Sequence, residues 1–241
     1  MALSFLEILW FALLPVLTIL VGGIIPFIQV PGPVFRNVML HFAAGVVFSV
    51  VAVELLPDIV EKHRPIEVMI GFGLGVAVML AVKHFTGKME SAAQSRTILP
   101  WGILIGTGVD ILLDGFLLGI GFAAGAKEGV LLALALSLEV FSLGIAISTE
   151  VRTKQFSRAK TLSIVLFMGA LFLVGTVLGA TLLSGMSQEM TELVLSFGLA
   201  ALLYLVTEEL LMEAHEEKES PLITSAFFVG FLFFLILGMV A

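Results

Sequence analysis

The chain has no cysteine and few charged residues. Of its 241 residues, 13% are Asp, Glu, Lys or Arg, whereas a soluble domain carries roughly 25%. The absence of cysteine excludes disulfides, thiolate metal sites and thiol redox chemistry. The net charge of −7 excludes the basic surface of a nucleic-acid-binding protein. The first ten residues contain no Lys or Arg, so we expect the first apolar segment to be retained as a span rather than cleaved as a signal peptide.

Apolar runs fill most of the remaining sequence. The chain is 59% hydrophobic with a mean hydropathy of +1.15. Its apolar segments are each near the ~20 residues that a membrane-spanning helix needs. We therefore predict an all-α polytopic membrane protein, a single transmembrane domain over residues 1–241, with eight helices at approximately 8–29, 38–57, 66–83, 98–124, 128–149, 160–184, 191–211 and 221–240.

The basic residues predict the orientation. Even-numbered loops hold only Lys62, Arg64 and Lys127, and the other nine of the twelve Lys and Arg residues lie in odd-numbered loops. By the positive-inside rule the odd loops are cytoplasmic and both termini are extracytoplasmic. We expect an integral multi-pass protein, most simply of a prokaryotic inner membrane. The odd-loop residues are Arg36, Lys83, Lys88, Arg96, Arg152, Lys154, Arg158, Lys160 and Lys218.

A weak internal repeat relates the second and seventh segments at an offset of 155 residues. FAAGVVFSVVAVELLPDIVE, from Phe42, aligns with FGLAALLYLVTEELLMEAHE, from Phe197. The agreement of acidic positions, such as Glu54 with Glu209, carries most of the weight. Because the two segments would cross the membrane in opposite directions, this pattern is typical of an inverted-repeat transporter.

Three carboxylates are predicted at mid-membrane depth. Asp110 and Asp114 are four residues apart, so on a helix they share one face. Glu139 lies at the centre of the next segment, which a short loop joins to the previous one, so we expect it level with the aspartates. Thr107 and Ser142 are further candidate ligands. No Lys, Arg or His lies at this depth to neutralise the acids, so a divalent cation, protons, or an exchange between them would satisfy the site.

A second set of polar residues lies near the ends of the second and seventh segments. These side chains are either solvated helix ends or the lining of a cation pathway. The histidines all lie near segment ends, where we expect them to be loop residues rather than ligands. The predicted pathway has an outer vestibule of Glu54 and Asp58 and an inner exit of Glu208, Glu209, Glu213 and His215.

With these residues the chain resembles the ZIP family of divalent-metal transporters over most of its length. The family's fourth helix carries a His-Asn-x-Pro-Glu/Asp-Gly motif, and here that stretch is DILLDG, with Asp110 at the histidine position and Asp114 and Gly115 matching directly. In the fifth helix EVFSLG places Glu139 at the first ligand position. The resemblance also implies that the family's second metal site is absent, because Ile111, Val140 and Thr176 occupy its positions.

The resemblance implies a homodimeric permease, not an enzyme, that takes up a divalent metal ion such as Zn²⁺, Mn²⁺ or Fe²⁺ as its substrate. Asp110, Asp114 and Glu139 would be the metal ligands, and an oxygen-only site favours Mn²⁺ over the metals that prefer imidazole. Two alternatives stay open. One is a ZIP-like protein that no longer transports metal and serves as a proton pathway or sensor. The other is an intramembrane protease, although the paired Glu208 and Glu209 lack the Arg and intramembrane His that such enzymes need.

Overall fold

A computed structural model describes residues 5–93, 101–154, 156–182, 186–215 and 220–240. Over these ranges all regular secondary structure is helical, without a strand, and eight helices are long and apolar enough to span a membrane. Both predictions are confirmed. The elements are α1 (Phe5–Ile28), α2 (Pro33–Val50), η1 (Val51–Leu55), α3 (Leu56–Glu61), α4 (Pro65–Ala93), α5 (Trp101–Ala124), α6 (Ala126–Thr153), α7 (Arg158–Leu182), α8 (Gln188–Tyr204), η2 (Leu205–Leu210), α9 (Leu211–His215) and α10 (Pro221–Val240).

Several helices are longer than their apolar segments. The second span runs over Pro33–Glu61 and the seventh over Gln188–His215, against predictions of 38–57 and 191–211. The difference arises because hydropathy detects only the part of a helix that is apolar, whereas the hydrogen-bonded backbone continues past the first charged residues. The predicted ends at 98–100 and 183–184, and the basic residues Arg96 and Lys218, lie outside the described ranges.

Four pairs of helices make the most extensive contacts: α1 with α6, α5 with α7, α2 with α10, and α4 with α8. Glycines allow their backbones to approach closely. A Cβ atom at Gly115 of α5 would overlap the carbonyl of Phe172 in α7, and one at Gly175 of α7 would overlap that of Leu112 in α5. Small residues let helices in a membrane pack backbone to backbone, so these contacts fix which helices lie next to the site.

Two spans contain a short π-helical segment. In the second span η1 includes Glu54, and in the seventh span η2 includes Glu208 and Glu209. Pro57 follows η1 and has no backbone N–H to donate to the preceding turn, which favours a local change of hydrogen-bond pattern there. Each π segment shifts the register of its helix beside an acidic side chain.

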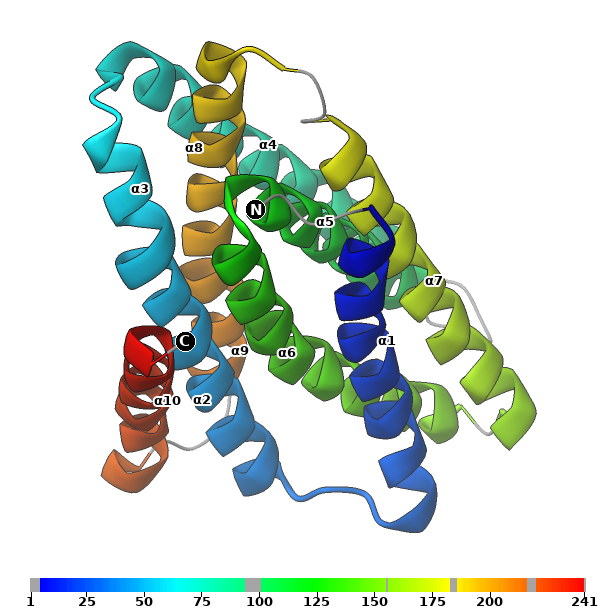
Figure 1. Cartoon of the computed structure of the whole chain (residues 1–241). Coiled ribbons are helices and arrows are strands. Elements are labelled where there is room, and N and C mark those ends of the chain that lie inside the picture. Colours follow the sequence, from blue (N-terminus) through cyan, green and yellow to red (C-terminus); the bar gives the residue numbers. More distant parts are fainter. Residues whose placement is uncertain (1–4, 94–100, 155, 183–185, 216–219, 241) are drawn as a thin grey trace.

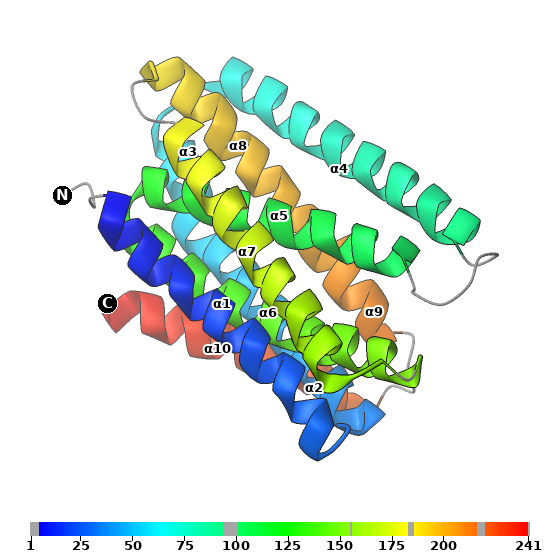
Figure 2. The same cartoon turned by 90° about the vertical axis from the view of Figure 1, so that its right-hand side faces the viewer.

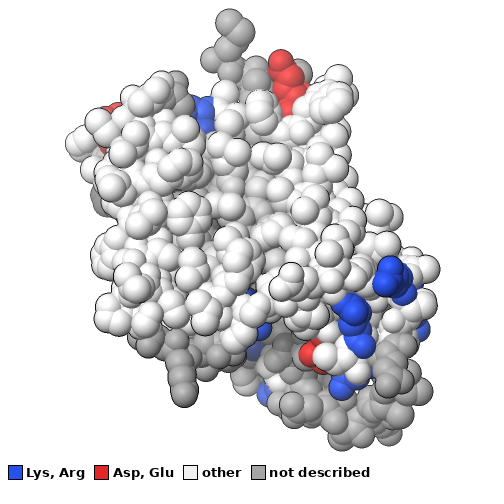
Figure 3. Space-filling model, turned by 90° about the horizontal axis from the view of Figure 1, so that it is seen from below, with Lys and Arg blue, Asp and Glu red and all other residues white. Residues whose placement is uncertain are grey.

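The helices form one bundle whose ends carry the charges. Helix α1 begins and α10 ends at the same end of the bundle (Figure 2), as an even number of spans requires. Seen from below, a broad uncharged surface separates the charged residues at its margins (Figure 3). The side chains on this surface include exposed Phe, Leu and Ile of α1, α7 and α10. This distribution fits a protein surrounded by lipid.

Candidate metal centre

A cavity of about 580 Å³ leads from one end of the bundle to the predicted acidic site. Its mouth is formed by the residues of the odd-numbered loops and the helix ends next to them, including Arg36, Lys83 and Glu150. Its inner wall carries Thr107 and Asp110 from α5 and Glu139 from α6. The predicted inner-exit residues Glu208, Glu209 and Glu213 also line it. The cavity therefore joins the mid-membrane acids to the odd-loop end.

The innermost carboxylates are buried. The exposed fraction of Asp114 is 2% and that of Glu139 is 3%. Within the described part of the chain, Oδ2 of Asp114 and Oε2 of Glu139 have no hydrogen-bond partner. Asp114, Asp110 and Glu209 are close enough to Glu139 that ionised carboxylates at these positions would repel one another. Burial of a carboxylate without a partner is costly, so a cation or a proton bound among these acids, which we call the acidic cluster, would lower that cost.

The predicted additional ligands have different positions. Thr107 lines the cavity together with Asp110. Ser142 is buried on α6, and its Oγ donates a hydrogen bond to the carbonyl oxygen of Leu138 at 3.3 Å. To serve as a ligand, the Ser142 hydroxyl oxygen would bind the metal ion through a lone pair while its hydrogen kept this bond, or the side chain would rotate away from Leu138.

Two cations stand at the cavity mouth beside the exit acids. Arg36 forms an ion pair with Glu213, and Nζ of Lys83 lies 2.9 Å from Oε2 of Glu208. Both pairs are partly exposed, so each contributes little to stability. Their position matters more, because they place two positive charges beside the acids that line the cavity.

Apolar side chains close the bundle on the other side of the acids. Leu117 and Ile120 of α5, Leu132 of α6, and Leu195 and Leu202 of α8 surround a void of only about 10 Å³. This volume is about the minimum for one water molecule and the lining is apolar, so the void is expected to be dry. We call these five residues the apolar seal. In this conformation they separate the acids from the even-loop end.

The predicted outer-vestibule acids lie beyond the apolar seal and are paired with lysines. Oε1 of Glu54 is 3.4 Å from Nζ of Lys127, which also donates a hydrogen bond to the carbonyl of Gly238 at 2.6 Å. Oδ2 of Asp58 is 2.8 Å from Nζ of Lys62. Glu54 and Asp58 thus do not join the mid-membrane acids but form ion pairs at the opposite end.

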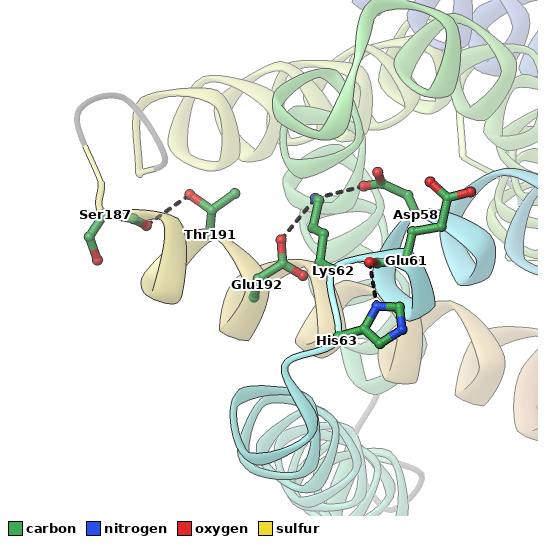
Figure 4. A network of polar contacts seen from close by, with 7 residues as sticks. All are labelled: Asp58, Glu61, Lys62, His63, Ser187, Thr191 and Glu192. Atoms are coloured by element: carbon green, nitrogen blue, oxygen red, sulfur yellow. Dashed lines mark hydrogen bonds and ion pairs between the residues drawn. The ribbon is translucent and has the colours of Figure 1, made fainter.

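A buried ion pair at that end was not anticipated from the sequence. Glu192, near the start of α8, is fully buried, and its Oε1 lies 2.8 Å from Nζ of Lys62 (Figure 4). Burial lowers the pKa of Lys62, but hydrogen bonds to Asp58 and Glu192 outweigh it and raise the pKa above its ordinary value of 10.5. Lys62, at the C-terminal end of α3, therefore pairs with Asp58 of the same helix and connects α3 to α8 through Glu192 (Figure 4).

The histidines do not all lie in loops. His41 is 1% exposed within α2, its Nδ1 is 3.0 Å from the carbonyl of Asn37, and its ring lies 5.6 Å from that of His215. The expectation of a loop residue is wrong for His41, and also for His84 within α4 and His215 at the end of α9. His41 was expected in a loop because it lies near the start of its apolar segment, but the helix already begins at Pro33, before that segment.

The side chains of the acidic cluster are not arranged as a finished metal site. Among the described residues, no group of three or more His, Cys, Asp or Glu side chains lies close enough together to hold a metal ion. A metal bound by Asp110, Asp114 and Glu139 would require their carboxylates to converge. Comparison with protein-family models gives no match, and comparison with curated proteins finds no significant relative.

Proposed function

We propose that the protein transports a divalent metal cation across the membrane through the acidic cluster of α5, α6 and the seventh span, as the resemblance to ZIP transporters implies. The observation that carries this proposal is a cavity that reaches Glu139, which with Asp114 is one of two buried carboxylates for which the described residues provide no ion pair. Asp110 and Glu139 line the cavity, while Asp114 and Glu139 are buried with unsatisfied oxygens. Intramembrane acids of this kind are typical of ion pathways.

The arrangement of helices supports an inverted repeat, which would give the protein two related conformations. At the offset of 155 residues, Val51–Leu55 corresponds to 206–210, which lies within η2, Leu205–Leu210. The main packing pairs correspond in the same way: α1 with α6 matches α7 with α5, and α2 with α10 matches α8 with α4. In the proposed cycle the apolar seal separates to admit the cation from the even-loop end, and the cavity releases it at the odd-loop end.

The ligand chemistry favours Mn²⁺ over Zn²⁺. The proposed ligands are carboxylate oxygens, with Thr107 and Ser142 as hydroxyl donors, and oxygen ligands suit the harder cations. Protons compete for the same oxygens, so uptake is expected to fall as the pH is lowered. By the same resemblance the protein would act as a homodimer in a prokaryotic inner membrane, with uptake directed toward the odd-loop side.

The test is metal uptake into proteoliposomes by the variants Asp110→Asn, Asp114→Asn and Glu139→Gln. Each removes one negative charge with little change in shape, and each is expected to reduce Mn²⁺ uptake to the level of protein-free vesicles. Glu61→Gln, which alters an exposed carboxylate outside the cavity, is the matched control and should retain wild-type uptake. Wild-type uptake by all three site variants would refute the assignment of the ligands.

The alternative is a protein of the same fold that conducts or senses protons. It is favoured by the lack of a converged group of three metal-binding side chains in the described structure, because protonation needs only single carboxylates. Thermal stabilisation of the purified protein by Mn²⁺ separates the two. The permease requires a stabilisation that is lost in Glu139→Gln, whereas the proton pathway requires none.

A further inference from the structure

Four basic residues where α6 ends and α7 begins form no ion pair with an acidic residue in the described part of the chain. Arg36, Lys62, Arg64, Lys83 and Lys127 all form ion pairs. In contrast, none of the four Lys and Arg residues between the end of α6 and the first turn of α7 forms an ion pair with a described acidic residue. Figure 3 shows blue side chains gathered at the lower right, at this corner of the bundle. We call this set the basic corner: Arg152, Lys154, Arg158 and Lys160.

The two arginines of the basic corner meet at one aromatic ring. Cζ of Arg152 lies 5.2 Å from the ring centroid of Phe27, at the end of α1, and Cζ of Arg158 lies 5.7 Å from the same centroid. Nζ of Lys160 lies 4.2 Å from the ring centroid of Phe156. A phenyl ring attracts a cation only weakly, so it holds the guanidinium groups in place without neutralising them.

Arg152 also has an unsatisfied donor. Its Nη1 is buried and has no hydrogen-bond partner within the described structure. A guanidinium presents five donors in a planar fork that matches a phosphate. Two guanidinium groups held beside one ring, without an acidic partner among the described residues, are suited to an anion that arrives from outside the chain.

We propose that the basic corner binds the phosphate of an anionic phospholipid. The corner lies where α1 and α6 end and α7 begins, at the end of the membrane-spanning region, which is the level of lipid headgroups. Exposed apolar side chains on α1 and α7 continue from it toward the membrane centre and would contact the acyl chains: Ile24, Ile28, Leu166 and Phe167. These neighbours favour a lipid over free phosphate, and the inference does not depend on metal transport.

The test is binding of phosphatidylglycerol to the purified full chain in neutral detergent, measured by native mass spectrometry. Each Arg near a headgroup is expected to change the apparent affinity about fivefold, so Arg158→Gln should weaken binding about fivefold and Arg152→Gln/Arg158→Gln about 25-fold. Lys88→Gln removes an exposed charge in another odd loop that forms no ion pair with a described residue and should leave binding unchanged. Circular dichroism spectra identical to wild type would establish that the variants are folded.

Two further ligands distinguish the sources of the anion. Phosphatidylcholine, which has a phosphate but no net charge, should bind the wild-type protein at least fivefold more weakly than phosphatidylglycerol. Inorganic phosphate at millimolar concentration should neither stabilise the protein nor compete with the lipid. Equal binding of phosphatidylglycerol by wild type and the double variant would overturn the proposal, as would equal binding of the two lipids or competition by phosphate.

Discussion

Replacement of Lys62 by Met should expose the energetic role of the buried pair between α3 and α8. Lys62→Met keeps the length of the side chain but leaves the carboxylate of Glu192, which is fully buried, without its cation. Breaking a buried ion pair costs about 3–5 kcal/mol. The side chain of Lys62 is 27% exposed, so solvent weakens the attraction and we expect a loss of about 2–3 kcal/mol. For a chain of this size this lowers the melting temperature by about 4–12 °C.

The assay is thermal unfolding in detergent, arranged as two double-mutant cycles. Lys62→Met combined with Glu192→Gln should show a coupling energy of about 1–2 kcal/mol, because both variants remove the same interaction. Lys62→Met combined with Asp58→Asn is the matched cycle, and its coupling should stay below about 1 kcal/mol because Asp58 is 36% exposed and its pair is screened. Equal coupling in both cycles would refute the idea that burial of Glu192 decides the strength of the network.

The same network predicts a dependence on high pH. The pKa of Lys62 is raised in the folded state by its hydrogen bonds, against the effect of burial. Its contribution to stability is therefore fully present below the unfolded value of 10.5 and is lost as the pH rises through the folded value. Wild type and Lys62→Met should approach one another in melting temperature only above about pH 10.5. Equal melting temperatures of wild type and Lys62→Met at neutral pH would contradict a positively charged Lys62.

Two further predictions use matched pairs of substitutions. Gly71→Ala places a Cβ atom against the backbone of α8 and should destabilise the protein by about 1–3 kcal/mol. A Cβ atom at Gly73 would meet nothing within 4 Å, so Gly73→Ala should stabilise the protein by about 0.5–1 kcal/mol. Thermal unfolding compares the two variants, and equal effects would argue against the close contact between α4 and α8. Because the chain has no cysteine, Thr107→Cys in the cavity should react with a membrane-impermeant maleimide added at the odd-loop side of oriented vesicles, whereas Leu195→Cys in the apolar seal should react from neither side. Reaction of Thr107→Cys only from the even-loop side would refute the described opening.

Most of the fold could be predicted because each span is a continuous apolar run and most charged residues lie between these runs. The ends of the second and seventh spans were less predictable. There the helix continues to Glu61 and His215 through charged residues, and hydropathy does not distinguish a solvated helical turn from a loop. The π segments could not be predicted either, although the repeat at an offset of 155 residues already aligned the residues that form them.

The site was partly predictable for a geometric reason. The spacing of Asp110 and Asp114 placed them on one face of a helix, but residues four apart also lie about one turn apart along its axis. The cavity ends between these two levels, so Asp110 lines it and Asp114 is buried beyond it. The role of Glu192 could not be predicted, because a Glu in the first turns of a helix normally faces water. Only the packing of α3 against α8 brings Lys62 to it.

Electrostatic repulsion among the carboxylates of the acidic cluster favours the binding of a metal ion or of protons. Two ionised carboxylates on one helix face, about 5–6 Å apart, repel by about 3 kcal/mol at an effective dielectric constant near 20. Glu139 is repelled by Asp114, Glu209 and Asp110, so an empty and fully ionised cluster accumulates several such terms. Among the described residues the apolar seal lies toward the even-loop end and the cavity opens at the odd-loop end, so in the proposed function relief of this repulsion comes through the cavity. In the proposed cycle, release of a cation at the odd-loop end therefore requires that protons, or the next cation, replace it.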